Sequence, residues 1–183
     1  MDPKSNLHGE STVKLPRTAR WVVVCVAVAV LAGVAGVVFS QRSNAAPDVS
    51  ITTLSGVATP MAALRGKVVL VNFWATTCAI CMHEMPKIVQ AYSDYAERGF
   101  EVIAVAMPYD RPDWVLAYSQ RSKLLFKVAI DFDGKINRAF GGIDATPVSF
   151  LIDRSGKVVE KIVGEPDFVW LRARIEAALA RLA

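Results

Sequence analysis

The sequence is poor in the residues that form most metal sites. It has 3 cysteines and 2 histidines among 183 residues, and after Asn44 only Cys78, Cys81 and His83 remain. A structural zinc site takes four such ligands, so this region offers too few for one. A purely structural disulfide between Cys78 and Cys81 would close so small a loop that it would constrain the unfolded chain little. We therefore expect neither a structural metal site nor a purely structural disulfide at this cysteine pair.

Long basic runs are also lacking. The net charge is +4, of which residues 1–20 contribute +2 and Arg42 one more, leaving +1 from Ala45 onwards. This remainder has no basic patch interleaved with aromatic residues, which excludes nucleic acid as an expected partner. The chain also has no internal repeat and no low-complexity tract.

One long apolar run is present, at residues 21–39. It carries no charge over 19 positions, and as a helix rising about 1.5 Å per residue it would span roughly 29 Å, close to the thickness of a bilayer core. Four basic residues precede the run and only Arg42 follows it closely. This asymmetry predicts a basic cytoplasmic tail at residues 1–20, a transmembrane anchor at 21–39 and an exported remainder.

A cleaved signal peptide is the alternative for the same run. Small residues at Ser43-Asn44-Ala45 offer a peptidase site. The run is longer than the roughly 7 to 15 apolar residues of a usual signal peptide, and Arg42 intrudes before the site, so we favour a retained anchor. Cys25 is interpreted as a small apolar residue embedded in the lipid, with no chemical role. Both alternatives export the same domain.

Residues 40–48 are expected to form a short polar linker, followed by one α/β domain at residues 49–183. In this domain short β-rich runs alternate with longer helical stretches. Strands are predicted at 49–54, 68–73, 101–106, 126–130, 148–152 and 158–163. Helices are predicted at 78–97, at 113–121, in a short segment between Asp133-Gly134 and Gly141-Gly142, and from Phe168 to Leu182. The Asp153–Gly156 turn predicts a hairpin between the last two strands.

The cysteine pair lies at the predicted junction of strand 68–73 and helix 78–97. Two intervening residues in a first helical turn put both sulfurs on one face, within bonding reach. Cys78 at the helix start lies near unpaired N–H groups that favour a thiolate, so we expect it to be the nucleophile. Cys81 lies one turn further in and would resolve the mixed disulfide. The pattern favours a redox-active disulfide as the only cofactor.

Three further segments help to identify a family: VLVNFWA at residues 69–75, EMP at 84–86 and ATPVSFLID at 145–153. With the cysteine pair they resemble the TlpA/ResA-like thiol-disulfide oxidoreductases over roughly residues 49–183. The resemblance implies a thioredoxin-like fold, a central mixed sheet flanked by helices, tethered to the periplasmic face of the bacterial inner membrane. It also implies that Pro147 is held in cis opposite the disulfide, with the backbone around Thr146 facing the substrate.

The resemblance assigns roles to three more side chains. Glu84 falls one turn after Cys81, where a carboxylate would take or return the Cys81 proton. Trp74 is expected to lie beside the disulfide, and both Trp74 and Thr77 are expected to contact the bound substrate. The chain departs from the pattern at Asn72, where thioredoxins have a buried Asp, and at Thr77, where family members usually have Trp. The Thr77 hydroxyl is expected to cap the helix instead.

The expected function is reduction of disulfides in exported proteins, with a membrane thiol-electron donor restoring the dithiol and cytochrome c maturation as one route. An oxidase or isomerase remains open, because the residue types between the cysteines do not fix the direction of electron flow. A copper-binding or copper-delivering module is a third possibility, since Cys78, Cys81, Met82 and His83 are copper-compatible ligands.

Overall fold

The computed structural model describes residues 26–31, 33 and 44–181. The whole predicted tail, most of the predicted anchor including Cys25, and part of the linker lie outside these residues. Residues 26–31 are helical and expose their side chains. Within the described part of the chain, no helix is both long and apolar enough to cross a membrane. Residues 44–181 belong to a compact unit of their own.

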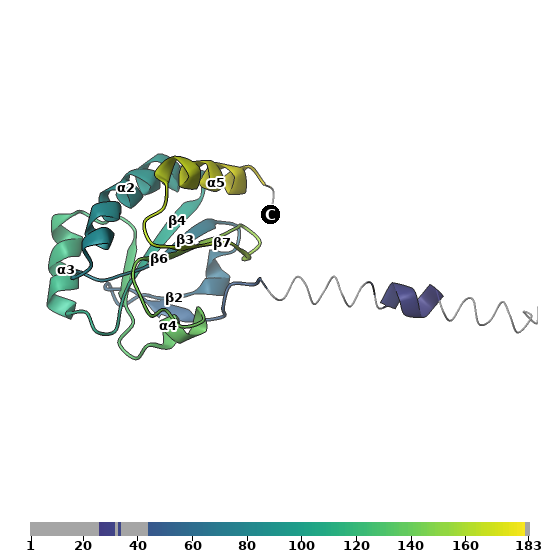
Figure 1. Ribbon diagram of the computed structural model, residues 1–183, viewed down its shortest axis with the longest axis horizontal. Coiled ribbons are helices and arrows are strands. Elements are labelled where there is room, and N and C mark those ends of the chain that lie inside the picture. Colours follow the sequence, from purple (N-terminus) through teal and green to yellow (C-terminus); the bar gives the residue numbers. More distant parts are fainter. Residues whose placement is uncertain (1–25, 32, 34–43, 182–183) are drawn as a thin grey trace, which may run out of the picture. The chain divides into compact units, whose positions relative to one another are not determined.

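A five-stranded mixed sheet organises this unit (Figure 1). Its strands, in spatial order, are β5 (Lys127–Ile130), β4 (Phe100–Ala106), β3 (Val68–Trp74), β6 (Val148–Ile152) and β7 (Val158–Val163). The first three are parallel, whereas β6 runs antiparallel to β3 and β7 antiparallel to β6. Every residue of β3 is buried, as an uninterrupted apolar run in a central strand requires.

Helices and a small hairpin cover the two faces of the sheet. One face packs against α2 (Ala79–Tyr95), α3 (Pro112–Arg121) and α5 (Phe168–Ala180). The other packs against β1 (Ser50–Thr52), β2 (Ala58–Pro60), the 3₁₀ helix η1 (Met61–Leu64) and α4 (Lys135–Ala139). Figure 1 shows α2 and α5 on one side of the sheet and α4 with β2 on the other.

The side chains of β3 divide between two apolar cores, because successive residues of a strand point to opposite faces. Leu70 and Trp74 belong to the core under α2 and α5. Val71 and Phe73 belong to the core over α4, where the Phe73 ring meets Phe140 at 5.4 Å. β3 therefore ties both layers to one central strand, and its last residues lead into the cysteine turn.

Most of the predicted elements are confirmed. Strands 148–152 and 158–163 have the predicted bounds, and their antiparallel pairing confirms the hairpin. Helix 78–97 is shorter than predicted: α2 ends at Tyr95 and a 3₁₀ turn, η2 (Ala96–Arg98), follows it. The short strand β2 and helix η1 were not predicted. Each has only three or four residues, too few to show a period in the sequence.

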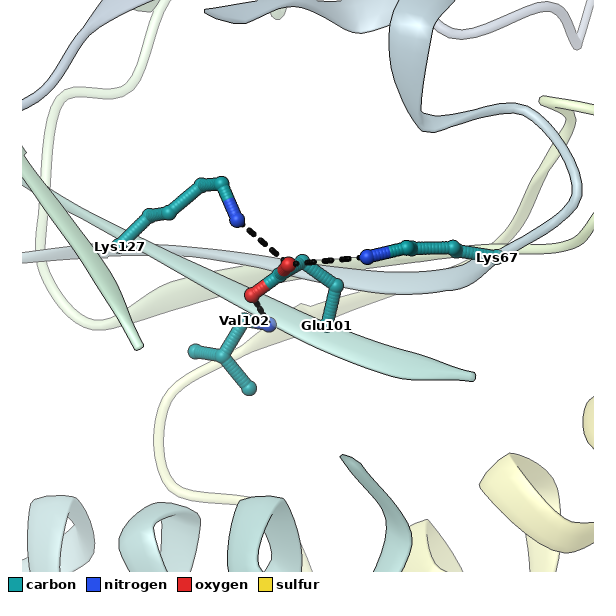
Figure 2. A network of polar contacts seen from close by, with 4 residues as sticks. All are labelled: Lys67, Glu101, Val102 and Lys127. Atoms are coloured by element: carbon teal, nitrogen blue, oxygen red, sulfur yellow. Dashed lines mark hydrogen bonds and ion pairs between the residues drawn. The ribbon is translucent and has the colours of Figure 1, made fainter. Parts of the chain in front are cut away.

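A buried carboxylate links three neighbouring strands near the far end of β4 from the cysteines. Glu101 is 4% exposed and accepts from Lys67 at 3.5 Å and from Lys127 at 2.5 Å. Figure 2 shows the carboxylate between the two ammonium groups, with the Val102 N–H also directed at it, 3.3 Å from Oε1. Lys67 precedes β3 and Lys127 begins β5, so the two ion pairs connect both neighbours of β4.

Glu101→Gln should lower the free energy of unfolding by about 1–2 kcal/mol, because it removes the charge that both lysines share while keeping the side chain's shape. Urea denaturation at pH 7 measures this effect. The exposed Glu97 provides the matched control: Glu97→Gln should change stability by less than about 0.5 kcal/mol. Equal losses in the two variants would show that the ion pairs do not stabilise the sheet.

Candidate active site

Cys78 and Cys81 form a disulfide at the junction of β3 and α2, with a Cα–Cα distance of 5.2 Å. Cys81 is fully buried, whereas Cys78 is only half-buried. A substrate therefore has access to the Sγ of Cys78 and not to that of Cys81. The predicted location and pairing of the two cysteines are both confirmed.

Cys78 itself caps α2. Its backbone is extended, at φ −89° and ψ 106°, and its Sγ accepts the Cys81 N–H at 3.1 Å. The prediction that the Thr77 hydroxyl caps the helix is therefore wrong: Thr77 lies one residue before the cap and is exposed. The reason is that a capping side chain must come from the residue whose backbone is extended at the first turn. The capping position holds Sγ at the positive end of the helix, where a thiolate is stabilised.

The loop before β6 faces the disulfide from the other side. The Thr146–Pro147 peptide bond is cis, as predicted. The carbonyl oxygen of Thr146 lies 3.6 Å from the Sγ of Cys78. Pro147 is buried and its carbonyl accepts the Gly164 N–H at 2.9 Å, which fixes the loop to the end of β7. Thr146, by contrast, is half-buried and presents backbone beside the accessible sulfur.

Glu84 lies one helical turn after Cys81 and is fully buried. Its Oε1 accepts from Asn72 Nδ2 at 2.9 Å, and the same amide group donates to Ser149 Oγ at 3.0 Å. Glu84 Oε2 and Asn72 Oδ1 have no hydrogen-bond partner in the part of the chain described. Burial raises the pKa of Glu84 to about 7; the Asn72 hydrogen bond opposes this rise, and the nearby charge of Glu165 adds to it. The carboxyl group therefore titrates near neutral pH.

The predicted contact between Trp74 and the substrate requires a correction. Its side chain is 0% exposed in this disulfide form, so it offers no surface to a substrate, contrary to the predicted contact. It packs in the same core as Cys81, and its ring lies 5.4 Å from that of Tyr118. An aromatic residue that ends a central strand is buried by the helices on that face, and here α2 and α3 do this. Trp74 therefore supports the site from beneath.

Asp110 is a site residue that sequence reasoning missed. Its buried carboxylate accepts from Thr76 N at 2.6 Å, from Thr76 Oγ1 at 2.5 Å and from Arg111 N at 2.9 Å. These bonds fix the turn before Cys78 to the loop between β4 and α3. Thr76 and Asp110 are 34 residues apart and no motif relates them, so only the parallel pairing of β3 with β4 brings them together.

The side chain of His83, a candidate copper ligand, pairs with Glu165. Its side chain is 67% exposed and its Nδ1 lies 3.0 Å from Glu165 Oε2, while Lys87 pairs with the other oxygen of Glu165 at 2.6 Å. Across residues 44–181 no three His, Cys, Asp or Glu side chains are grouped to hold a metal ion. The His83 ring is thus paired with Glu165 in this structure.

Comparisons with known proteins agree with this geometry. The Redoxin family model matches residues 41–179. The chain is 40% identical to the thiol-disulfide oxidoreductase ResA of Bacillus anthracis over 126 residues, 68% of this chain and 71% of that protein. It is 35% identical to ResA of Geobacillus thermodenitrificans over 121 residues, 66% of this chain and 68% of that protein.

A solved structure extends the agreement to the fold. It is a thiol:disulfide interchange protein of the thioredoxin family from Chlorobium tepidum TLS, which superposes with a TM-score of 0.69 at 33% identity. The match covers 75% of this chain and 97% of that one. The predicted thioredoxin-like α/β fold, with a central mixed sheet and flanking helices, is thereby confirmed.

The raised pKa of Glu84 predicts a pH dependence of stability. The folded carboxyl titrates at about 7 and the unfolded one near 4.5, so between these values the folded state binds more protons. Stability from this group is therefore fully present below pH 4.5 and is lost as pH rises through 7, a change of about 3 kcal/mol. Glu84→Gln mimics the protonated form and should lack this loss.

Urea denaturation of both oxidised proteins from pH 4 to 8 measures the effect. Groups other than Glu84 titrate alike in the two proteins, so the difference between their unfolding free energies isolates Glu84. Parallel profiles would contradict a buried carboxyl with a pKa near 7.

Proposed function

The chain belongs to the Redoxin family, among the ResA-like thiol-disulfide oxidoreductases, and we propose that it reduces disulfides of exported proteins. The observation that carries this proposal is the Cys78–Cys81 disulfide at the start of α2, with only Cys78 accessible. An accessible sulfur paired with a shielded one is the arrangement that successive attack and resolution require.

The reaction begins from the dithiol. The Cys78 thiolate attacks one sulfur of a substrate disulfide, and the other substrate sulfur leaves as a thiolate that takes up a proton. Cys81, once deprotonated, attacks the Sγ of Cys78, which re-forms the Cys78–Cys81 disulfide and releases the second substrate thiol. Two electrons pass to the substrate, and a membrane thiol-electron donor returns the protein to the dithiol.

Glu84 is proposed to handle the proton of Cys81. Both side chains are fully buried on α2, one turn apart, so water does not readily exchange protons with the thiol. A carboxyl with a pKa near 7 is suited to accept and return a proton at neutral pH. Asn72 cannot take this role, because an amide neither accepts nor releases a proton at this pH.

Thr146, Pro147 and Thr77 are proposed to contact the substrate. The half-buried Thr146 presents backbone next to the Sγ of Cys78, where an extended substrate segment can form main-chain hydrogen bonds, as in strand addition. Pro147 holds this loop in place, and the exposed Thr77 borders the same sulfur on the side of α2.

We place the domain on the periplasmic side of the bacterial inner membrane, anchored by residues 21–39. The basic residues before this run and the exposed apolar side chains of helical residues 26–31 support the placement. One substrate class would be unfolded c-type cytochromes, whose Cys-x-x-Cys-His segments must be reduced before haem attachment.

Cys81→Ala should accumulate mixed disulfides through Cys78, because the resolving thiol is missing. The full chain is expressed in bacterial cells with Cys25→Ala in every variant, so that the remaining adducts arise from the domain. Non-reducing gels detect the adducts and mass spectrometry identifies the substrates.

The matched control is Cys78→Ala with Cys81 intact, which should form no adducts because Cys81 is buried. A folded Cys81→Ala protein without adducts would refute the dithiol-exchange cycle. Adducts confined to cytoplasmic proteins would refute the proposed placement.

The redox potential distinguishes reductase from oxidase. Equilibration of the full chain in detergent with a dithiol–disulfide buffer should give a potential near the roughly −270 mV of thioredoxin. A value near the roughly −120 mV of a strong oxidant would favour disulfide formation in the substrate and overturn the proposed direction. Thiol alkylation followed by mass spectrometry reads the reduced fraction.

A further inference from the structure

A groove lies beside the disulfide, between α2 and α3. Its volume is about 380 Å³, and we call it the α3 groove. The lining residues are Thr76, Met82, Trp114, Ala117, Tyr118 and Arg121. None of them belongs to the loop of Thr146 and Pro147, so the α3 groove is a second surface near the reactive sulfur.

The α3 groove is joined to the reactive cysteines at two points. Thr76 is two residues before Cys78, and Met82 directly follows Cys81. The bonds from Thr76 to Asp110 hold this wall against the loop that leads into α3. An extended peptide advances about 3.3 Å per residue, so residues one to three positions from a cysteine bonded to Cys78 fall within reach of the groove.

The walls of the α3 groove are mainly apolar. Trp114 is 46% exposed, and Met82 and Tyr118 are half-buried. Tyr118 is fixed by its ring contact with Trp74 at 5.4 Å, while a methionine side chain adapts to different shapes. A rigid aromatic wall facing an adaptable thioether suits an apolar side chain such as leucine or phenylalanine.

One end of the α3 groove is positively charged. Arg121 lies there, is exposed, and takes part in none of the ion pairs among the described residues. At the other end Arg111 stacks on Trp114 at 4.8 Å, but its charge is offset by Asp113 at 2.7 Å. No carboxylate lines the groove. An acidic group on the occupant would therefore complement Arg121.

We propose that the α3 groove binds the substrate segment next to the cysteine that bonds to Cys78, and that it selects segments with one apolar and one acidic side chain. The proposal rests on the proposed dithiol-exchange function and adds a specificity to it. Trp114 and Arg121 are the specificity-determining residues, and neither takes part in sulfur chemistry.

The test uses the reduced full chain in detergent and four short peptides, each with one cysteine in a mixed disulfide with a chromogenic aromatic thiol. The residues near the cysteine are Leu with Asp, Leu with Lys, Gly with Asp, or Gly with Gly. Release of the chromophore gives a second-order rate constant for each peptide. Hydroxyethyl disulfide, which is too small to reach the groove, reports the intrinsic reactivity of Cys78.

The Leu–Asp peptide should react fastest. Arg121→Gln should slow it about fivefold and leave the Leu–Lys peptide unchanged, as expected for loss of one partly exposed ion pair. Arg121→Glu should invert the preference towards Leu–Lys. The matched control is Lys123→Gln, which removes an exposed charge outside the groove and should leave all four rates within twofold of wild type.

Trp114→Ala should slow both leucine peptides about tenfold relative to the glycine peptides, because a leucine side chain loses much of its apolar contact. Leu116→Ala is the control, since Leu116 is equally exposed on α3 but does not line the groove. Ala117→Trp, which fills the groove, should abolish discrimination among the peptides. Reduction of hydroxyethyl disulfide should be unchanged in all these variants.

Two failures are distinguishable. Equal rates for the four peptides, with hydroxyethyl disulfide still reduced, would overturn the α3 groove as a subsite and leave the proposed function standing. Failure of the wild-type protein to reduce hydroxyethyl disulfide would refute the function itself. If Arg121→Gln altered only the self-association of the chain in sedimentation, the groove would be an interface between copies, which also overturns the proposal.

Discussion

The hydrogen bond from the Cys81 amide to the Sγ of Cys78 is the constraint around which the site is built. It makes the reactive sulfur the cap of α2, so one contact sets both the start of the helix and the position of the nucleophile. β3 is buried along its whole length, and its end therefore fixes where this cap lies relative to both cores. The loop of Thr146, the turn of Thr76 and the buried Glu84 each meet the cysteines from a different direction, and each depends on that placement.

A short polar chain crosses the otherwise apolar layer beneath the disulfide. Ser149 on β6 and Asn72 on β3 are register partners, and the Asn72 amide joins Ser149 to Glu84 on α2. Because a neutral amide cannot compensate a negative charge as a lysine would, the carboxyl keeps much of its burial penalty, and its pKa stays near 7. The substitution of Asn for a buried Asp therefore separates two tasks: Asn72 orients the carboxyl group, and Glu84 titrates.

Local pattern predicted the sheet and the cysteine pair well, because apolar runs such as β3 and the hairpin of β6 and β7 record burial directly in the sequence. The same reasoning failed for residues whose role depends on the backbone conformation of one residue or on contacts between distant parts of the chain. By residue type Thr77 is the better cap, but the extended residue at the first turn is Cys78, and its Sγ caps the helix. The burial of Trp74 depends on α3, and the bonds between Asp110 and Thr76 depend on strand pairing. Neither contact leaves a pattern in the neighbouring sequence from which it could be predicted.

The two surfaces beside Cys78 differ in what they can recognise. The loop of Thr146 offers backbone, and main-chain hydrogen bonds are available to any extended segment, so this side supports affinity with little discrimination. The α3 groove offers an aromatic wall and a charge, which respond to side-chain type. A reductase with only the first surface would act on any accessible disulfide, at a rate set by the thiolate. Asp110 ties the turn before Cys78 to the loop that begins α3, so a side chain seated in the groove and a sulfur at Cys78 share one rigid support. Selectivity can therefore act on the attacking step itself.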